Sequence, residues 1–285
     1  MHRRDFLGAS LGAGLIGFSP LPALASHRPP TPPTRSRVKH SVCRWCYGSI
    51  DLDTLCQRSA EMGAHSVELL TEKEWSIPAK YGITCAVAMG PTSISRGYNR
   101  PAHHDEFTKE GERLLPLVKD AAIPNMIVFS GNRAGMDDAE GLKNCAAGLR
   151  RLTPLAESLG VTIIMELLNS KVDHKDYMCD RTRWGVNLVE EVASDRFRLL
   201  YDIYHMQIME GDVIRTLRDN IKSIAHIHTG GVPGRREIDE TQELFYPAIV
   251  KALMDAGYTG YVGQEFIPSK EAMASLKAAI ALCDV

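Results

Sequence analysis

The chain has 285 residues, of which 44% are hydrophobic and 24% charged, so it can bury a sizeable core and falls in the ordinary globular class. Lys and Arg number 33 against 35 Asp and Glu, which gives a formal net charge of −2. Such a balance provides no field that would gather nucleic acid or an anionic membrane surface. Composition therefore argues against a polyanion-binding protein, and it allows one large domain or two small ones.

Residues 1–25 have the features of an export signal. Arg3-Arg4 is followed by an apolar run of small residues from Leu7 to Phe18 and then by Ala23-Leu24-Ala25. The paired arginines resemble a twin-arginine signal, whose route exports folded proteins, and the Ala-Leu-Ala run supplies the small residues that a signal peptidase accepts. Because the apolar run is too short to span a bilayer comfortably, we expect a periplasmic protein without stable membrane insertion. A frayed N-terminal helix is the alternative.

The next segment, residues 26–37, is predicted to be a linker. It contains the run HRPPTPPTRSR, which is Pro-rich and basic and has no hydrophobic periodicity. Loss of the signal removes a net charge of +1 and leaves the mature chain at −3, so the argument against polyanion binding is unchanged. We expect the folded domain to cover residues 38–285.

Seven cysteines are an odd number, and they are not spaced as a disulfide framework. Folding before export would keep the thiols reduced. Cys43 and Cys46 suggest a redox pair, but no second pair of Cys or His lies nearby in the sequence to complete a zinc site. We predict thiols that pack in the core or line the site. A disulfide between these two residues after export is the alternative.

From Val38 onward, short apolar runs typical of strands alternate with longer helical patterns. The predicted strands are 38–43, 65–70, 84–89, 125–130, 161–166, 197–202, 223–228 and 261–266. The predicted helices are 51–62, 105–122, 137–159, 182–192, 212–220, 246–256 and 269–283, with Asp51 and Asp137 as N-caps. Several strands are apolar almost throughout, as in a parallel sheet covered on both faces. Eight such units in about 250 residues predict a single-domain (β/α)8 TIM barrel.

Four residues that suit metal binding close or nearly close the last four predicted strands: Glu166, Asp202, His228 and Glu265. In a TIM barrel the catalytic groups sit at the C-terminal ends of the strands. Three carboxylates and an imidazole at one mouth would be costly to bury together unless a divalent cation lay between them. This oxygen-rich set suits one Mn²⁺, Mg²⁺ or Co²⁺ ion better than structural Zn²⁺. Helix capping or pairing with a surface Arg is the alternative for each acid.

Four segments resemble the hydroxypyruvate isomerase branch of the xylose-isomerase-like barrels, which also contains ketose 3-epimerases. They are IMELLN (164–169), YDIYHMQ (201–207), HIH (226–228) and GQEF (263–266). The resemblance extends from about Val38 to the C-terminus and implies that Glu166, Asp202, His228 and Glu265 bind one divalent ion, with Glu166 and Glu265 as the acid/base pair. The isomerase pattern has Gln at the position of His228, whereas the epimerases have His there. The segment CRWCYG (43–48) also differs from the Asn-rich first segment of the isomerase pattern.

The chemistry expected of such a site is proton transfer next to a carbonyl. Metal coordination of a carbonyl and an adjacent hydroxyl would acidify the intervening C–H through an enediolate, and two opposed carboxylates could remove and return the proton. We therefore expect isomerisation or epimerisation of a small sugar or hydroxy-keto acid. A dehydratase or lyase acting on a keto sugar or polyol is the alternative on the same metal site. A non-catalytic exported sugar-binding protein is the alternative of another class, and an abasic-site nuclease would need more His ligands and a basic groove.

Six further residues are predicted substrate contacts: His205, Arg235, Arg236, Glu68, Asn169 and His174. His205 should open the helix after Asp202 and point into the mouth, and the two arginines lie in a Gly/Pro-rich loop of the kind that covers sites. Glu68 ends the second predicted strand, where it could reach substrate or, as we favour, pair with Arg44 or Lys73. For His226 we favour packing in an inner barrel layer. A homo-oligomer is possible.

Overall fold

The computed structural model describes residues 37–285. The predicted export signal (1–25) and nearly all of the predicted linker (26–37) lie outside the described residues. Among residues 37–285, no helix is both long and apolar enough to cross a bilayer.

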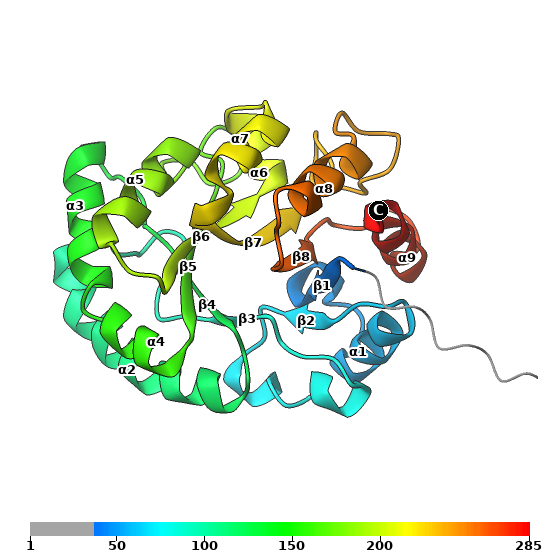
Figure 1. Ribbon diagram of the computed structural model, residues 1–285, viewed down its shortest axis with the longest axis horizontal. Helices are drawn as coiled ribbons and strands as arrows, with labels where there is room; N and C mark the ends of the chain where they lie inside the picture. The colour runs from blue at the N-terminus through cyan, green and yellow to red at the C-terminus, as the bar shows by residue number, and fades with distance from the viewer. Residues whose placement is uncertain (1–36) are drawn as a thin grey trace, which may run out of the picture. The chain divides into compact units, whose positions relative to one another are not determined.

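Eight parallel strands form the barrel that the sequence predicts. They are β1 (Lys39–Cys43), β2 (Ser66–Glu68), β3 (Val87–Met89), β4 (Asn125–Val128), β5 (Thr162–Leu167), β6 (Phe197–Asp202), β7 (Ile224–Thr229) and β8 (Tyr261–Gln264). Their order in the sheet is β2-β1-β8-β7-β6-β5-β4-β3. Parallel bridges between Ser66 and Thr84 and between Leu70 and Ala88 join the β2 and β3 edges. The sheet is thereby nearly closed, with the helices around it (Figure 1).

Nine α-helices are found in the described part of the chain. They are α1 (Leu52–Glu61), α2 (His104–Asp120), α3 (Asp138–Leu149), α4 (Thr153–Leu159), α5 (Thr182–Val192), α6 (Ile203–Met209), α7 (Val213–Asn220), α8 (Tyr246–Asp255) and α9 (Ala272–Cys283). Short 3-10 turns cover 44–47, 72–74, 78–81, 101–103 and 221–223. The predicted caps are confirmed: Asp51 accepts from the Thr54 N–H, and Asp137 accepts from the N–H groups of Ala139 and Glu140. A cap of this kind contributes about 1 kcal/mol.

One connection differs from the prediction, and another, for which no helix was predicted, contains only short turns. The single helix expected over 137–159 is divided into α3 and α4, and Pro154 is the second residue of α4. A proline inside a continuous helix would remove a hydrogen bond and clash with the carbonyl four residues earlier, whereas the first turn tolerates it. Between β2 and β3 the described chain forms only the turns at 72–74 and 78–81, the second of which begins with Pro78.

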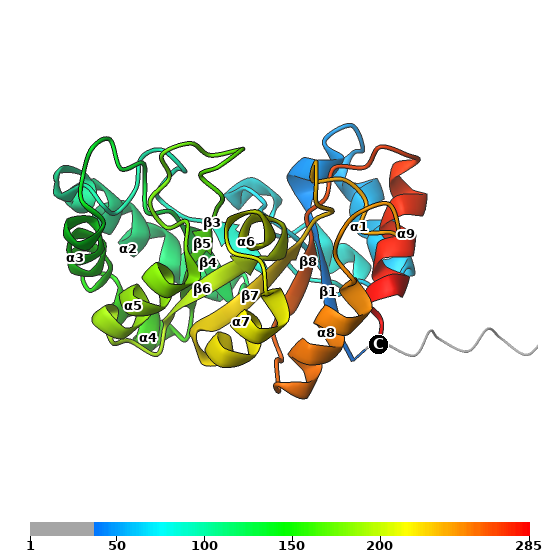
Figure 2. The same ribbon diagram turned by 90° about the horizontal axis from the view of Figure 1, so that it is seen from above.

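The strands converge on the end of the barrel where functional side chains are expected. Asp202 on β6 is level with His228 on β7, and His228 is level with Gly263 on β8. Figure 2 shows the barrel from the side, with the segments that follow β1, β7 and β8 gathered at one rim. Side chains at these strand ends therefore face one another across the mouth.

Candidate metal centre

The four predicted ligands come together at the mouth of the barrel. Glu166 is in β5, Asp202 ends β6, His228 is in β7, and Glu265 directly follows β8. One ligand atom from each residue lies within 4.8 Å of the corresponding atoms of the other three, and all four side chains are buried. The parallel register accounts for this, since neighbouring strands end at the same edge.

The nitrogen and oxygen atoms of the cluster fit a cation. His228 Nδ1 lies 2.9 Å from Glu265 Oε2 and 3.5 Å from Glu166 Oε1. Both His228 Nδ1 and Glu166 Oε1 are buried and make no hydrogen bond. The 2.9 Å contact between His228 Nδ1 and Glu265 Oε2 does not have the geometry of a hydrogen bond. Buried polar atoms without partners are rare because each costs free energy. A divalent ion among three carboxylates and one imidazole nitrogen would satisfy both atoms, and the donor set suits Mn²⁺, Mg²⁺ or Co²⁺.

Arg235 lies over the cluster from the segment between β7 and α8. Its Nη2 donates to Glu265 Oε2 at 2.6 Å and to Asp202 Oδ2 at 3.4 Å. The guanidinium packs against the rings of Trp45 and Tyr204, at 5.0 and 5.3 Å from their centroids. Arg236 is exposed, and its side chain makes no hydrogen bond or ion pair within residues 37–285. The structure therefore places only the first of the two predicted arginines at the cluster.

His205, Asn169 and His174 lie together beside Asp202. One oxygen of Asp202 caps α6 by accepting from the His205 N–H at 3.0 Å, and the other lies 3.6 Å from His205 Nε2. Asn169 Nδ2 lies 2.6 Å from His205 Nδ1, and the ring of His174 meets the ring of His205 edge-on at 5.2 Å. Asp202 thus combines the helix-capping role, expected only as an alternative, with a position in the cluster.

The predicted pairing of Glu68 with Arg44 or Lys73 is wrong. The Glu68 side chain is completely buried and accepts from Nε2 of His226 at 2.9 Å and from Nε2 of His228 at 2.7 Å. Arg44 donates instead to the carbonyl of Tyr47. Glu68 is level with Cys43 on β1, and because side chains alternate along a strand its carboxylate points into the barrel. The carboxylate is thus held by two imidazoles inside the barrel, and its contact with substrate stays a prediction.

Sequence reasoning missed two residues at the mouth. Trp45, which is 45% exposed, donates from Nε1 to Glu265 Oε1 at 2.8 Å. Asp173 accepts from Asn169 Nδ2 at 2.6 Å and from the Tyr204 hydroxyl at 2.8 Å. The position of Trp45 directly after β1 was a usable signal, because strand ends line the mouth. No comparable signal marked Asp173, which lies in the long segment between β5 and α5.

The electrostatic environment shifts the pKa values of Glu166 and Glu265 in opposite directions. Burial, and then the charge of Glu265, raise the pKa of Glu166 above its usual value, against the opposing effect of His228. Burial also opposes ionisation of Glu265, but the charges of Arg235 and His228 outweigh it and hold the pKa of Glu265 well below its usual range. Carboxyl groups whose pKa values are pushed apart in this way suit opposite roles in proton transfer.

The thiols near the cluster are not paired with one another. All seven cysteines are free; six are buried, and Cys46 is partly buried. Cys43 Sγ lies 3.4 Å from Glu68 Oε1 and 3.6 Å from His228 Nε2. The structure thus shows Cys43 beside the site, while a Cys43–Cys46 disulfide after export stays a prediction.

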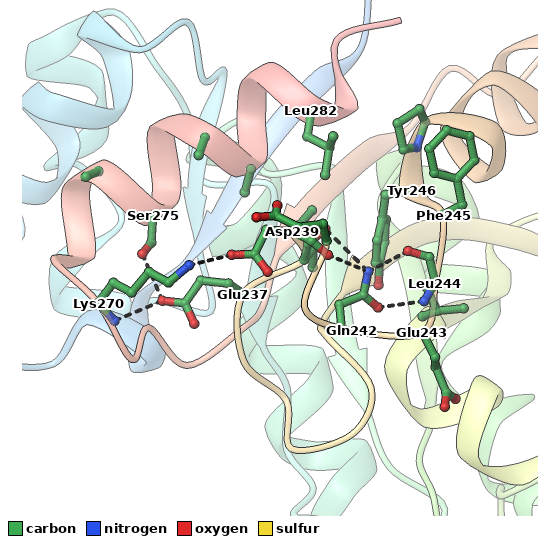
Figure 3. A pocket seen from close by; sticks show the side chains of 16 residues that line it. Glu237, Asp239, Gln242, Glu243, Leu244, Phe245, Tyr246, Lys270, Ser275 and Leu282 are labelled. Carbon is green, nitrogen blue, oxygen red and sulfur yellow. Dashed lines mark hydrogen bonds and ion pairs between the residues drawn. The ribbon is translucent and has the colours of Figure 1, made fainter.

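A large cavity lies elsewhere, between α9 and the segment that joins β7 to α8 (Figure 3). Its volume is about 620 Å³. Two of the acidic groups on its wall are already bonded: Glu237 accepts from the hydroxyls of Ser269 and Ser275, and Asp239 accepts from Lys270. None of the four clustered residues lines it. The candidate site is therefore assigned to the cluster at the barrel mouth.

Comparisons with known proteins agree with this architecture. Residues 56–282 match the family model described as xylose isomerase-like TIM barrel. The 2-oxo-tetronate isomerase of Cupriavidus necator is 36% identical over 121 residues, 42% of this chain and 46% of that protein. The hydroxypyruvate isomerase of Escherichia coli is 32% identical over 114 residues, 39% of this chain and 44% of that protein. The matched regions thus span less than half the length of these two relatives.

One solved structure illustrates the likeness in fold. The D-psicose 3-epimerase of Clostridium cellulolyticum has a TM-score of 0.70, with 87% of this chain and 97% of that chain covered. The two sequences are 19% identical over this alignment. The superposition shows that the two chains share a fold.

Proposed function

The chain belongs to the xylose isomerase-like TIM barrel family, and from this premise we propose that it is a divalent-metal-dependent isomerase or epimerase acting on a small sugar or hydroxy-keto acid. The observation behind the proposal is the buried convergence of Glu166, Asp202, His228 and Glu265 within 4.8 Å. Relatives named as isomerases and an epimerase support the reaction class.

The proposed ligands are these same four side chains, and the proposed acid/base pair is Glu166 and Glu265. The bound ion would supply Lewis acidity, polarising a substrate carbonyl so that the neighbouring C–H becomes more acidic. One glutamate takes this proton, and the other delivers a proton to the neighbouring carbon in an isomerisation or to the opposite face of the same carbon in an epimerisation. Because the two stand on β5 and at the end of β8, with β6 and β7 between them, they approach a substrate from different sides. The substrate's placement then decides between 1,2-isomerisation and 3-epimerisation.

Substrate recognition is proposed for the polar groups around the cluster. Arg235 has a guanidinium held between two rings at the mouth, so it can donate to a substrate carboxylate or hydroxyl. His205 Nε2 is buried without a hydrogen-bond partner beside Asp202, which suits it to a substrate oxygen. Asn169 and His174 contact the ring of His205 and would hold it in place.

The test is solvent exchange at carbon. Mature protein with Mn²⁺ is incubated in D2O with hydroxypyruvate and with a panel of ketoses, and the products are followed by NMR. We expect deuterium at the carbon next to the carbonyl of at least one compound, together with an isomer or epimer of it. Loss of water or of another leaving group in place of isomerisation would favour the dehydratase or lyase alternative. Saturable sugar binding without any exchange would favour the sugar-binding protein and contradict the proposal.

Export is a separate proposal that rests on residues 1–25 alone. The twin arginines, the short apolar run and Ala23-Leu24-Ala25 support a periplasmic location reached in the folded state. N-terminal sequencing of the protein from a periplasmic fraction tests it. The expected first residue is Ser26, and full-length protein retained in the cytoplasm would contradict the proposal.

A further inference from the structure

We infer that Glu68 is a positioning residue of the metal centre, fixing the ring of His228 from inside the barrel so that Nδ1 faces the three carboxylates. This inference rests on the proposed function, since it gives the imidazole a purpose only if the cluster binds a cation. The carboxylate of Glu68 meets Nε2 of His228 at 2.7 Å, while Nδ1 at the opposite side of the same ring lies among the ligand oxygens.

The hydrogen-bond inventory at Glu68 sets the tautomer. Its Oε1 is approached by Nε2 of His226, by Nε2 of His228 and by the Cys43 thiol, and each of these three groups can donate a hydrogen bond. An ionised carboxylate can only accept hydrogen bonds, so each imidazole must present its N–H at Nε2. Neutral His228 then carries a lone pair at Nδ1, which is the form that binds a metal ion.

The contact between Glu68 and His228 is possible because residue 263, which lies between them, is a glycine. In the sheet, β1 and β8 separate β2, which carries Glu68, from β7, which carries His228. Gly263 on β8 leaves room for the contact because it has no side chain. A Cβ atom there would lie 2.7 Å from Glu68 Oε1 and 2.7 Å from His228 Cδ2. Both distances are shorter than real Cβ contacts allow, so any side chain at Gly263 would displace the pair.

The competing explanation is that Glu68 only bonds two buried histidines and stabilises the barrel core. Both explanations predict a less stable protein when Glu68 is changed. Only the positioning role predicts a change in the protonated nitrogen of His228 and a loss of metal affinity in protein that is still folded. The test therefore measures metal binding and the tautomer and does not depend on turnover.

The experiment compares mature wild type with Glu68→Gln and the matched control Glu237→Gln. The amide that Glu68→Gln introduces can donate to Nε2 of His228 and so favour a proton on Nδ1, the nitrogen that the metal needs. Glu237 is the other buried glutamate outside the cluster, and it bonds Ser269 and Ser275. Titration with Mn²⁺ alone, followed by the EPR signal of free Mn²⁺, should show affinity about 10- to 100-fold weaker for Glu68→Gln. The control should stay within about twofold of wild type, and circular dichroism checks that each variant is folded.

Nitrogen-15 NMR of the metal-free protein, at an alkaline pH where the His228 ring is neutral, supplies a second readout. Wild-type His228, assigned by the signal lost in His228→Gln, should be protonated at Nε2, and Glu68→Gln should move the proton to Nδ1. If Glu68→Gln does not fold, Gly263→Ala replaces it and should weaken Mn²⁺ binding to a similar extent.

Folded Glu68→Gln with wild-type Mn²⁺ affinity, or a neutral wild-type His228 ring with its proton on Nδ1 and not on Nε2, would overturn the inference. Failure of the wild type to bind Mn²⁺ would contradict the proposed function, and the NMR result would still decide the tautomer.

Discussion

The two halves of the barrel have different roles. In the second half β5, β6 and β7 have six residues each and β8 has four, whereas in the first half β1 has five, β4 has four, and β2 and β3 have three each. All four proposed ligands come from β5 to β8, and the contacts that orient two of them come from Glu68 and Trp45 in the first half. The half with more residues in strands thus carries all four proposed ligands, and the other half supplies side chains that contact two of them.

The largest expected effect falls on the second half. Glu166→Gln and Glu265→Gln should each lower kcat on the substrate found by deuterium exchange by about 10²- to 10⁴-fold, because each removes a proton-transfer group. Steady-state kinetics with saturating Mn²⁺ measure this. Glu237→Gln, a buried glutamate outside the cluster, should keep kcat within about threefold of wild type. A near wild-type rate in either cluster variant would remove that residue from the acid/base pair.

Removal of divalent ions should affect all four proposed ligands of the second half together. We expect EDTA to abolish turnover and Mn²⁺ to restore it, because the ligands on β5 to β8 would be joined through one ion. Mn²⁺ at 100 times its Kd should also stabilise the protein by about 2.7 kcal/mol, seen as a rise in Tm. Full turnover in EDTA would contradict a metal-dependent reaction, and a Tm that is insensitive to Mn²⁺ would contradict binding.

A smaller effect is expected from the first half. Trp45→Phe keeps a ring beside Arg235 but deletes the Nε1–H donated to Glu265. A hydrogen bond to a charged group contributes about 1.5–3 kcal/mol, so kcat/KM should fall roughly 10- to 100-fold. Exposed Phe245, at the edge of the cavity beside α9, offers a control in Phe245→Leu, which should leave kcat/KM unchanged. A fall beyond about 10⁴-fold in Trp45→Phe would place Trp45 among the reacting groups.

The smallest expected effect concerns the other end of β1. Burial lowers the pKa of His40 from 6.5 to about 4, with Asp284 opposing the shift. A folded-state pKa below the unfolded one means that the unfolded chain binds more protons between those pH values, so stability is lost as pH falls through 6.5 toward 4. The loss between pH 7.5 and pH 5 amounts to about 2 kcal/mol from this group.

Urea unfolding of wild type and His40→Leu at both pH values measures this contribution. The variant should lose about 2 kcal/mol less than wild type over the interval. Because His40 lies at the start of β1, away from the mouth, Mn²⁺ affinity should be the same in both proteins. An identical pH dependence in the two proteins would show that His40 does not contribute to acid lability.

Much of the fold was predictable because its signals are local. Apolar runs ending in polar residues marked the strands, and Asp51 and Asp137 marked the helix starts. The convergence of Glu166, Asp202, His228 and Glu265 followed from one rule about the ends of parallel strands. The division of the helix at Pro154 was not fixed by the proline alone, since α2 continues through Pro116.

The remaining features depend on how the barrel closes. Glu68 meets His228 through the space over Gly263, whereas sequence proximity favoured Arg44 or Lys73. Such a contact between β2 and β7 is set by the packing of the barrel interior, which no local pattern encodes. The placement of Arg235 between Trp45 and Tyr204 has the same origin, because it joins segments after β7, β1 and β6.

The most direct test of the metal centre is a crystal structure of the mature protein soaked in Mn²⁺, with the ion located by anomalous scattering. We expect one strong peak within about 2.3 Å of an atom from each of Glu166, Asp202, His228 and Glu265, with His228 bound through Nδ1. A mouth without a peak, or an ion bound elsewhere in the molecule, would contradict this expectation.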